Sequence, residues 1–265
     1  MKTSLQRTVV AFLLDRTGSM QSCKAATIEA FNGYLEGLKQ GPESKLIEFT
    51  FLQFDSQSLD KICVAEELGN VRPLDDATYQ PRASTPLIDA AYKTIKAVEA
   101  ALAKREDEPK VVICIQTDGF ENASTEYTMP QLNVLIKEKV KSGWQFVFMG
   151  AGIDAYAQSG QMGIAAVSTA SYNRESPRAA RAAFAAMAEN TREFSSGRRM
   201  HAEFDMRQRV ASGDAYADHY LNADGTAKNA PPDPASAKAQ PLPPVPPRPI
   251  SRPGTAPAIV DDFTL

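Results

Sequence analysis

The chain has 265 residues, 43% of them hydrophobic, which is enough apolar surface to bury the core of one medium-sized domain with appendages. Its formal net charge of −3 gives no global attraction to nucleic acid or to an anionic membrane, because such binding depends on clustered Lys and Arg. The cysteines Cys23, Cys63 and Cys114 are few and widely spaced. They indicate a reducing compartment rather than a zinc motif or a disulfide scaffold.

The first apolar run, residues 8–14, follows basic residues in the manner of a signal peptide. Because Asp15 ends this run and no small-residue cleavage site follows, we interpret it as a first strand. No stretch approaches the roughly 18 apolar residues that a membrane span requires. The sequence therefore predicts a soluble, cytoplasmic protein without a membrane partner.

From residue 8 to about residue 194, short β-rich runs alternate with amphipathic helical segments. This alternation is typical of an α/β fold with a doubly wound, mainly parallel sheet and helices on both faces. The predicted strands cover residues 8–14, 45–54, 58–64, 110–116, 145–149 and 165–170. The predicted helices cover residues 22–40, 86–103, 129–142, 154–162 and 176–194. Because the run 58–64 carries Asp60 and Lys61, we expect it at a sheet edge, where charge discourages unwanted pairing.

The character of the sequence changes beyond residue 197. We expect one domain over residues 1–197, a polar and partly helical extension over 198–222, and a disordered Pro-rich tail over 223–265. Repeated prolines in the tail remove backbone donors, and too few apolar side chains offset the entropy of ordering. The tail ends in an acidic and apolar tip at Asp261-Asp262-Phe263, which is a workable docking peptide after a spacer.

Five oxygen-bearing side chains follow strand ends or precede a helix. Asp15, Thr17 and Ser19 follow the first strand, Asp118 follows the strand 110–116, and Thr85 precedes the helix 86–103. In a doubly wound sheet, ligands bind at the carboxyl ends of the strands, so these side chains are expected to converge. Oxygen-only ligands select hard cations such as Mg²⁺. The sequence therefore predicts one metal site at this edge.

Each of these residues also has a simpler explanation. Thr85 before Pro86 is a good helix start, since a Thr cap followed by Pro satisfies free amides without a metal. Ser19 could cap the helix after it, and Asp118-Gly119 is an ordinary turn sequence. The order of the residues and their common position at element ends favour the metal site.

The motifs Asp15-x-Thr17-x-Ser19, Thr85-Pro86-Leu87 and Thr117-Asp118-Gly119 together resemble the metal-ion-dependent adhesion site of von Willebrand factor A domains. The resemblance covers roughly residues 8–194, and Gly150 resembles the family's glycine at the end of the fifth strand. It implies a six-stranded sheet in the order 3-2-1-4-5-6, with one antiparallel edge strand.

The resemblance also implies a function. Asp15, Thr17, Ser19, Thr85 and Asp118 would hold a divalent cation, usually Mg²⁺, with Mn²⁺ or Ca²⁺ as alternatives. Because neutral hydroxyls leave the cation's charge undercompensated, a partner protein's Asp or Glu can complete the site. We expect a non-enzymatic binding or scaffolding module of this kind. Intracellular members of the family often work beside AAA+ ATPases, and the acids of the chain's own tip are a second candidate ligand.

Two other functions compete with this interpretation. Asp15 at a strand end also resembles the nucleophile of haloacid-dehalogenase-like phosphohydrolases, but that family needs a second Asp where this chain has Thr17. The glycines of Gly150-Ala151-Gly152 could approach a phosphate, although a tight turn explains them equally well.

The arginine-bearing stretch 174–209 is interleaved with acids. We interpret it as a solvated helical face, with an RNA-binding accessory protein as the alternative.

Overall fold

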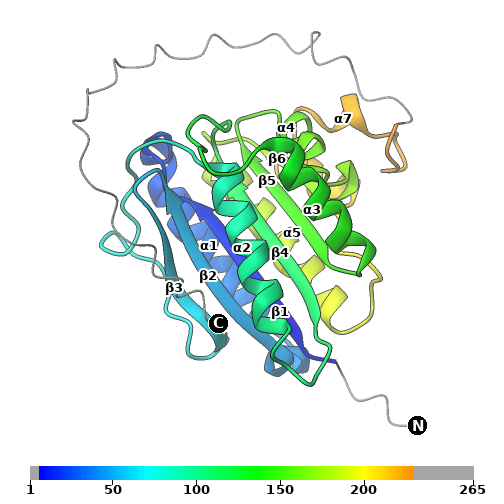
Figure 1. Cartoon of the computed structure of the whole chain (residues 1–265). Coiled ribbons are helices and arrows are strands. Elements are labelled where there is room, and N and C mark those ends of the chain that lie inside the picture. Colours follow the sequence, from blue (N-terminus) through cyan, green and yellow to red (C-terminus); the bar gives the residue numbers. More distant parts are fainter. Residues whose placement is uncertain (1–5, 229–265) are drawn as a thin grey trace, which may run out of the picture.

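The computed structural model describes residues 6–228 (Figure 1). The predicted Pro-rich tail lies outside this range from residue 229 on, and so does the whole acidic tip. Within residues 6–228, none of the helices combines the length and the apolar character that a bilayer crossing requires.

A six-stranded sheet forms the centre of the molecule, in the order β3-β2-β1-β4-β5-β6. β3 pairs antiparallel with β2, and the other neighbouring strands are parallel. The strands are β1 (Thr8–Asp15), β2 (Ile47–Asp55), β3 (Ser58–Glu67), β4 (Lys110–Thr117), β5 (Gln145–Ala151) and β6 (Thr169–Tyr172). The sheet order and the antiparallel edge confirm the predicted fold.

Helices cover both faces of the sheet (Figure 1). α1 (Lys24–Lys39) and α5 (Pro177–Ser195) lie on one face, and α2 (Leu87–Leu102) and α3 (Met129–Lys141) lie on the other. The shorter helices are η1 (Gly18–Cys23), η2 (Pro42–Leu46), α4 (Ala155–Met162), η3 (Ala166–Ser168), α6 (Met206–Ala211) and α7 (Ala217–Tyr220).

β1 is buried along its whole length, because both of its faces are covered. Its side chains alternate between the two cores: Phe12 packs in the core beneath α1 and α5, and Leu13 packs in the core beneath α2 and α3. Asp15 at the end of β1 is level with Phe54 of β2, and Leu14 is level with Gln116 of β4. This register brings the ends of the three central strands to the same edge of the sheet.

The last strand lies further along the chain than the predicted residues 165–170. Residues Ala166–Ser168 form a 3-10 turn, closed by a hydrogen bond from the Ser168 amide to the Ala165 carbonyl. β6 then begins at Thr169, which pairs with Phe148 of β5. The local sequence does not fix this start, because it depends on the register with β5.

The polar stretch beyond residue 197 packs against the domain through α6 and α7. Arg209 of α6 is 1% exposed and donates hydrogen bonds to the carbonyl oxygens of Thr169 and Val167 and to the Tyr156 hydroxyl. The interpretation of the arginines as a solvated face is therefore wrong for Arg209. Its guanidinium is buried because it satisfies several carbonyl oxygens at once, which a periodicity argument does not reveal.

Candidate metal centre

Asp15 is fixed in place at the end of β1. Its side chain is fully buried, and Oδ1 accepts a hydrogen bond of 2.6 Å from the Thr17 amide. Oδ2 accepts a hydrogen bond of 2.5 Å from the Thr117 hydroxyl at the end of β4, and the Asp15 carbonyl accepts one of 2.6 Å from Tyr79. The loop after β1 and the end of β4 are therefore joined through one carboxylate.

Ser19 connects the loop after β1 to Asp118. The Ser19 hydroxyl donates a hydrogen bond of 2.6 Å to Oδ1 of Asp118, and it lies 3.2 Å from the Thr17 hydroxyl. Ser19 is exposed, whereas Thr17 is 1% exposed and Asp118 is 4% exposed. These side chains form a continuous chain of oxygen atoms that opens to solvent at Ser19.

Thr85 reaches the same cluster from the loop before α2. A Cβ placed on Gly119 would lie 3.4 Å from the Thr85 hydroxyl and 3.8 Å from the Ser19 hydroxyl. Both hydroxyls therefore lie over the turn that follows Asp118, and the absence of a side chain at Gly119 leaves this space open. The structure thus places all five predicted side chains at one edge of the sheet.

Helix capping does not account for Thr85. The amides of Ile88 and Asp89, at the start of α2, donate to Oε2 of Glu121 at 2.8 Å and to the Ser124 hydroxyl at 3.0 Å. Among the described residues, no amide of α2 donates to the Thr85 hydroxyl. Capping by a separate loop leaves that hydroxyl available to the cluster.

Two backbone hydrogen bonds attach the loop before α2 to the loop after β1. The Gly18 amide donates to the Ala83 carbonyl at 3.0 Å, and the Arg82 amide donates to the Arg16 carbonyl at 2.9 Å. Ala83 adopts a φ of +60°, a left-handed conformation that is costly for a non-glycine residue. Backbone strain beside a cluster of polar groups is frequent at functional sites.

The two carboxylates are costly to keep ionised without a cation. Burial raises the pKa of Asp15 to about 7, although hydrogen bonds from Thr117 and Thr17 act in the opposite direction. Burial likewise raises the pKa of Asp118, against the hydrogen bond from Ser19 and the charge of Arg174. A cation bound between them would stabilise both ionised forms.

The donor set fits a hard divalent cation. It consists of two carboxylates and three hydroxyls, and it holds no imidazole or thiol. Residues 6–228 contain no group of three or more His, Cys, Asp or Glu side chains that could hold a metal ion, so the donor set depends on its hydroxyls. Oxygen donors of this kind suit Mg²⁺, Mn²⁺ and Ca²⁺.

An ion-pair cluster beneath the site was not predicted. Oδ2 of Asp55, at the end of β2, accepts hydrogen bonds of 2.8 Å from both Arg16 and Arg82, and Arg16 also pairs with Asp60 at 2.8 Å. The side chain of Asp55 is fully buried, and Arg16 is 8% exposed. In the sequence, only Asp55 could have indicated this ion-pair cluster, because it is a third carboxylate at the end of a strand.

Arg174 is a second side chain that sequence reasoning missed. Its Nη1 lies 3.1 Å from Oδ2 of Asp118, so it contacts a predicted metal ligand directly. It comes from the link between β6 and α5, far from Asp118 in sequence.

The two glycines that could approach a phosphate have packing roles. A Cβ on Gly150 would lie 2.7 Å from Ala155, and a Cβ on Gly152 would lie 3.1 Å from Arg174.

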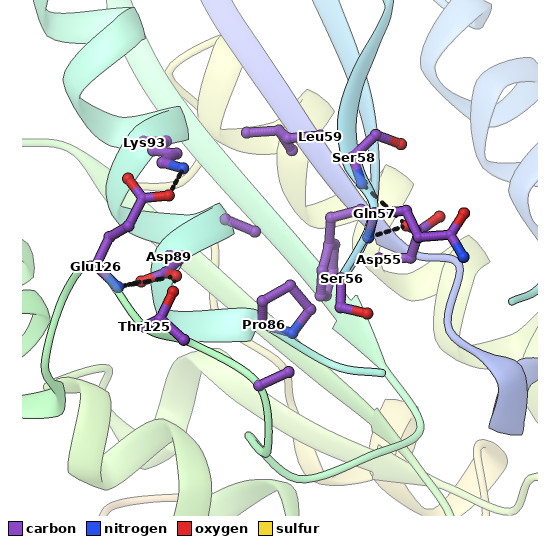
Figure 2. A pocket seen from close by; sticks show the side chains of 13 residues that line it. Asp55, Ser56, Gln57, Ser58, Leu59, Pro86, Asp89, Lys93, Thr125 and Glu126 are labelled. Atoms are coloured by element: carbon purple, nitrogen blue, oxygen red, sulfur yellow. Dashed lines mark hydrogen bonds and ion pairs between the residues drawn. The ribbon is translucent and has the colours of Figure 1, made fainter. Parts of the chain in front are cut away.

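A cavity of about 220 Å³ lies beside the cluster, between the β2–β3 turn and the start of α2 (Figure 2). Asp55, Gln57 and Ser58 line one side of it, and Asp89 and Glu126 line the other. Asp89 accepts hydrogen bonds from the amides of residues 125–127, so its carboxylate is already satisfied by the protein. The cavity lies beside the candidate site and is not a second carboxylate centre.

Neither a protein-family model nor a curated protein matches the sequence. The chain is similar to the pilus adhesin SpaC of Lactobacillus rhamnosus GG, with a TM-score of 0.55 and 12% identity over 72% of this chain and 31% of the adhesin. It is also similar to the minor pilin PilB of Streptococcus sanguinis, with a TM-score of 0.53 and 12% identity over 73% of this chain and 63% of the pilin. A von Willebrand factor type A structure from Catenulispora acidiphila superposes with a TM-score of 0.45 and 13% identity over 71% of this chain and 43% of that one.

The chain thus spans about a third of the length of SpaC and less than two thirds of PilB. At such low identity, the likeness shows a common fold alone. The sheet order of this chain, β3-β2-β1-β4-β5-β6, is the one implied by the resemblance to von Willebrand factor A domains.

Proposed function

We propose that this chain is a non-enzymatic binding or scaffolding module that works through a divalent cation. The cation is Mg²⁺ in the first place, with Mn²⁺ or Ca²⁺ as alternatives. Asp15, Thr17, Ser19, Thr85 and Asp118 would hold it, some of them through water. A protein partner would complete the site with the carboxylate of an Asp or a Glu.

One observation carries this proposal: three hydroxyl side chains converge on two buried carboxylates, and the five groups come from three loops. The Ser19 hydroxyl, 2.6 Å from Asp118, is the exposed member of the cluster. A cation here would have protein oxygens on its buried side and an approach from solvent at Ser19. A carboxylate that approaches from solvent would meet a cation whose charge is only partly offset by neutral hydroxyls.

The arrangement favours binding over hydrolysis. Phosphoester hydrolysis by a nucleophilic Asp15 would need a group that donates a proton to the leaving oxygen. The residue two positions later is Thr17, which is 1% exposed and carries a hydroxyl whose pKa lies far above neutral, unlike that of a carboxyl group. The nucleophile itself has both of its oxygens hydrogen-bonded to the protein.

The partner is proposed to be a protein with an accessible acidic side chain, such as an AAA+ ATPase or another component of a larger assembly. The chain's own tip at Asp261-Asp262-Phe263, which lies outside the described residues, is a second candidate ligand. Its acids would then compete with the partner for the same cation.

Affinity capture with the immobilised full chain tests this function. In Mg²⁺, the wild-type protein and Ser22→Ala are expected to retain a common partner that is lost in EDTA and with Ser19→Ala. Ser22 is a matched control, because it is an exposed serine of the same 3-10 turn and donates only to the Ser19 carbonyl. Removal of residues 259–265 is expected to increase capture if the tip competes.

Capture of the same proteins in every condition would contradict the cation-dependent mechanism. Turnover of phosphoesters by the purified chain in Mg²⁺, absent in Ser19→Ala, would replace it with the hydrolase alternative.

A further inference from the structure

Arg174 and Ser19 divide the two oxygens of Asp118 between them. Oδ1 accepts the Ser19 hydroxyl at 2.6 Å, and Oδ2 accepts Nη1 of Arg174 at 3.1 Å. The carboxylate is fully buried, whereas the Arg174 side chain is 38% exposed. One face of this carboxylate therefore belongs to the oxygen cluster, and the other already carries a positive charge.

The position of Arg174 is built into the fold. Its side chain passes over Gly152, which has a φ of +69° and would place a Cβ 3.1 Å from the Arg174 Cβ. The link that carries Arg174 is held at both ends. The Asn173 amide donates to the Ser212 carbonyl of the C-terminal extension at 3.2 Å, and Ser176 caps α5. The guanidinium is thus presented to Asp118 by an ordered loop.

The charges around the site show what Arg174 changes. Arg16 and Arg82 are matched by Asp55 and Asp60 in the neighbouring ion-pair cluster. At the site itself, Asp118 pairs with the guanidinium of Arg174, and Asp15 is the second carboxylate of the cluster. With both acids ionised, the metal-free site carries one net negative charge, and a divalent cation would convert this to one net positive charge. Without Arg174 the loaded site would be neutral.

We propose that Arg174 is an internal counter-ion that sets the metal affinity and the partner preference of this site. It pairs with Asp118 in the metal-free protein and opposes the entry of a divalent cation by charge repulsion. In the loaded site it leaves a net positive charge, which favours an acidic partner. This inference rests on the proposed function, because it concerns the same site.

Replacement of Arg174 changes the metal affinity in opposite directions under a structural role and under a counter-ion role, so the two roles can be told apart. A residue that merely supports the loop would weaken metal binding when it is replaced. An internal counter-ion strengthens metal binding when its charge is removed, because the cation then has no competitor for Asp118. Tighter metal binding is expected only when the positive charge is removed, so Arg174→Lys should bind the metal as the wild type does.

Titration of Mn²⁺ alone into the chelator-treated full chain, followed by calorimetry, tests the proposal. Arg174→Gln is expected to bind Mn²⁺ roughly 3- to 10-fold more tightly than the wild type. Arg174→Lys and the control Arg181→Gln are expected to remain within about 2-fold of it. Arg181 is a suitable control because it is an exposed arginine of α5 whose partner is Glu29.

Thermal unfolding provides a second measurement. In EDTA, Arg174→Gln is expected to unfold at a lower temperature than the wild type, since Asp118 loses its counter-charge. Saturating Mn²⁺ is expected to raise its melting temperature by more than it raises that of the wild type.

The outcomes separate the inference from the function on which it rests. Equal or weaker Mn²⁺ binding by Arg174→Gln, with clear binding by the wild type, overturns the role of Arg174 and leaves the metal site standing. No binding by either protein overturns both. Binding by Arg174→Gln alone supports the inference in its strongest form, with Arg174 excluding the metal.

Discussion

Asp55 lies at the end of β2 with a fully buried side chain, and its charge is offset by two guanidinium groups. Burial alone would raise the pKa of Asp55, but hydrogen bonds from Arg82, the Gln57 amide and Arg16 outweigh it and hold the pKa below its usual range. Because Arg16 and Arg82 belong to the loops that carry Thr17 and Thr85, this carboxylate joins the two halves of the site.

A carboxylate with a lowered pKa stabilises the folded state at neutral pH, and this contribution disappears as acid protonates it. Asp55→Asn is therefore expected to lower the free energy of unfolding by about 2–4 kcal/mol at pH 7, since it leaves two guanidinium groups undercompensated. The difference from the wild type should shrink as the pH falls below about 4, because the unfolded chain takes up the proton there before the folded carboxylate does. Urea denaturation between pH 3 and pH 7 measures both effects.

Asp60→Asn provides the control for this prediction. Asp60 also pairs with Arg16 at 2.8 Å, but its side chain is 41% exposed. Its replacement is expected to cost less than about 1 kcal/mol. Equal losses for the two variants, or a loss for Asp55→Asn that does not depend on pH, would contradict the role assigned to Asp55.

Whether the role of a residue could be predicted depends on whether that role is set by the neighbouring sequence or by contacts in the folded chain. The five oxygen-bearing residues could be located in the sequence because each lies next to the end of an apolar strand or the start of a helix. Arg16, Asp55 and Arg174 could not be assigned, because an ion pair depends on how two loops lie in space. Arg174 and Asp118 are separated by 56 positions, and nothing local to either residue indicates that they meet.

At the scale of elements, the start of α2 depends on another loop. Oε2 of Glu121, in the link between β4 and α3, accepts the Ile88 amide, and Oε1 accepts the amides of Ala123 and Ser124. In the same link, Asn122 accepts the Thr85 amide at 2.8 Å. One connection thus caps α2 and holds the backbone of Thr85.

Glu121→Ala is expected to lower the free energy of unfolding by about 1–2 kcal/mol, because it removes the cap of a helix and leaves several amides without partners. It should also weaken Mn²⁺ binding, since the Thr85 loop loses support. Glu126→Ala is the matched control from the same link. Its partner is Lys93 at the surface, so a change within about 0.5 kcal/mol is expected.

Chemical denaturation measures this difference between the two glutamates. A loss for Glu121→Ala no larger than that for Glu126→Ala would show that capping across the loop does not stabilise α2.

The elements themselves were predicted to different degrees. β1 and β4 were recognisable because strands covered on both faces are continuously apolar. β6 was misplaced because Ala166–Ser168 carries no residue that marks a 3-10 turn, and pairing with β5 decides where the strand begins. The 3-10 turn Gly18–Cys23 before α1 was also absent from the prediction, and its Ser19 contacts Asp118, which is distant in sequence.

At the scale of the whole molecule, the fold explains why the site forms. The level ends of β1, β2 and β4 bring Asp15, Asp55 and Thr117 to one edge of the sheet, and the loops that cross this edge add Ser19 and Thr85. The sheet order was predictable because the alternation of strands and helices allows few topologies. The docking of α6 and α7 was not, because it depends on a buried arginine in a polar segment.

The central claim is that the five oxygen-bearing residues bind one divalent cation. Calorimetric titration of the full chain with Mn²⁺, with Ser19→Ala and Ser22→Ala in parallel, tests it most directly. We predict one ion per chain for the wild type and for Ser22→Ala, displacement by excess Mg²⁺, and binding at least about 10-fold weaker for Ser19→Ala. Equal binding by both serine variants would contradict the claim, and so would the absence of binding by the wild type and Arg174→Gln alike.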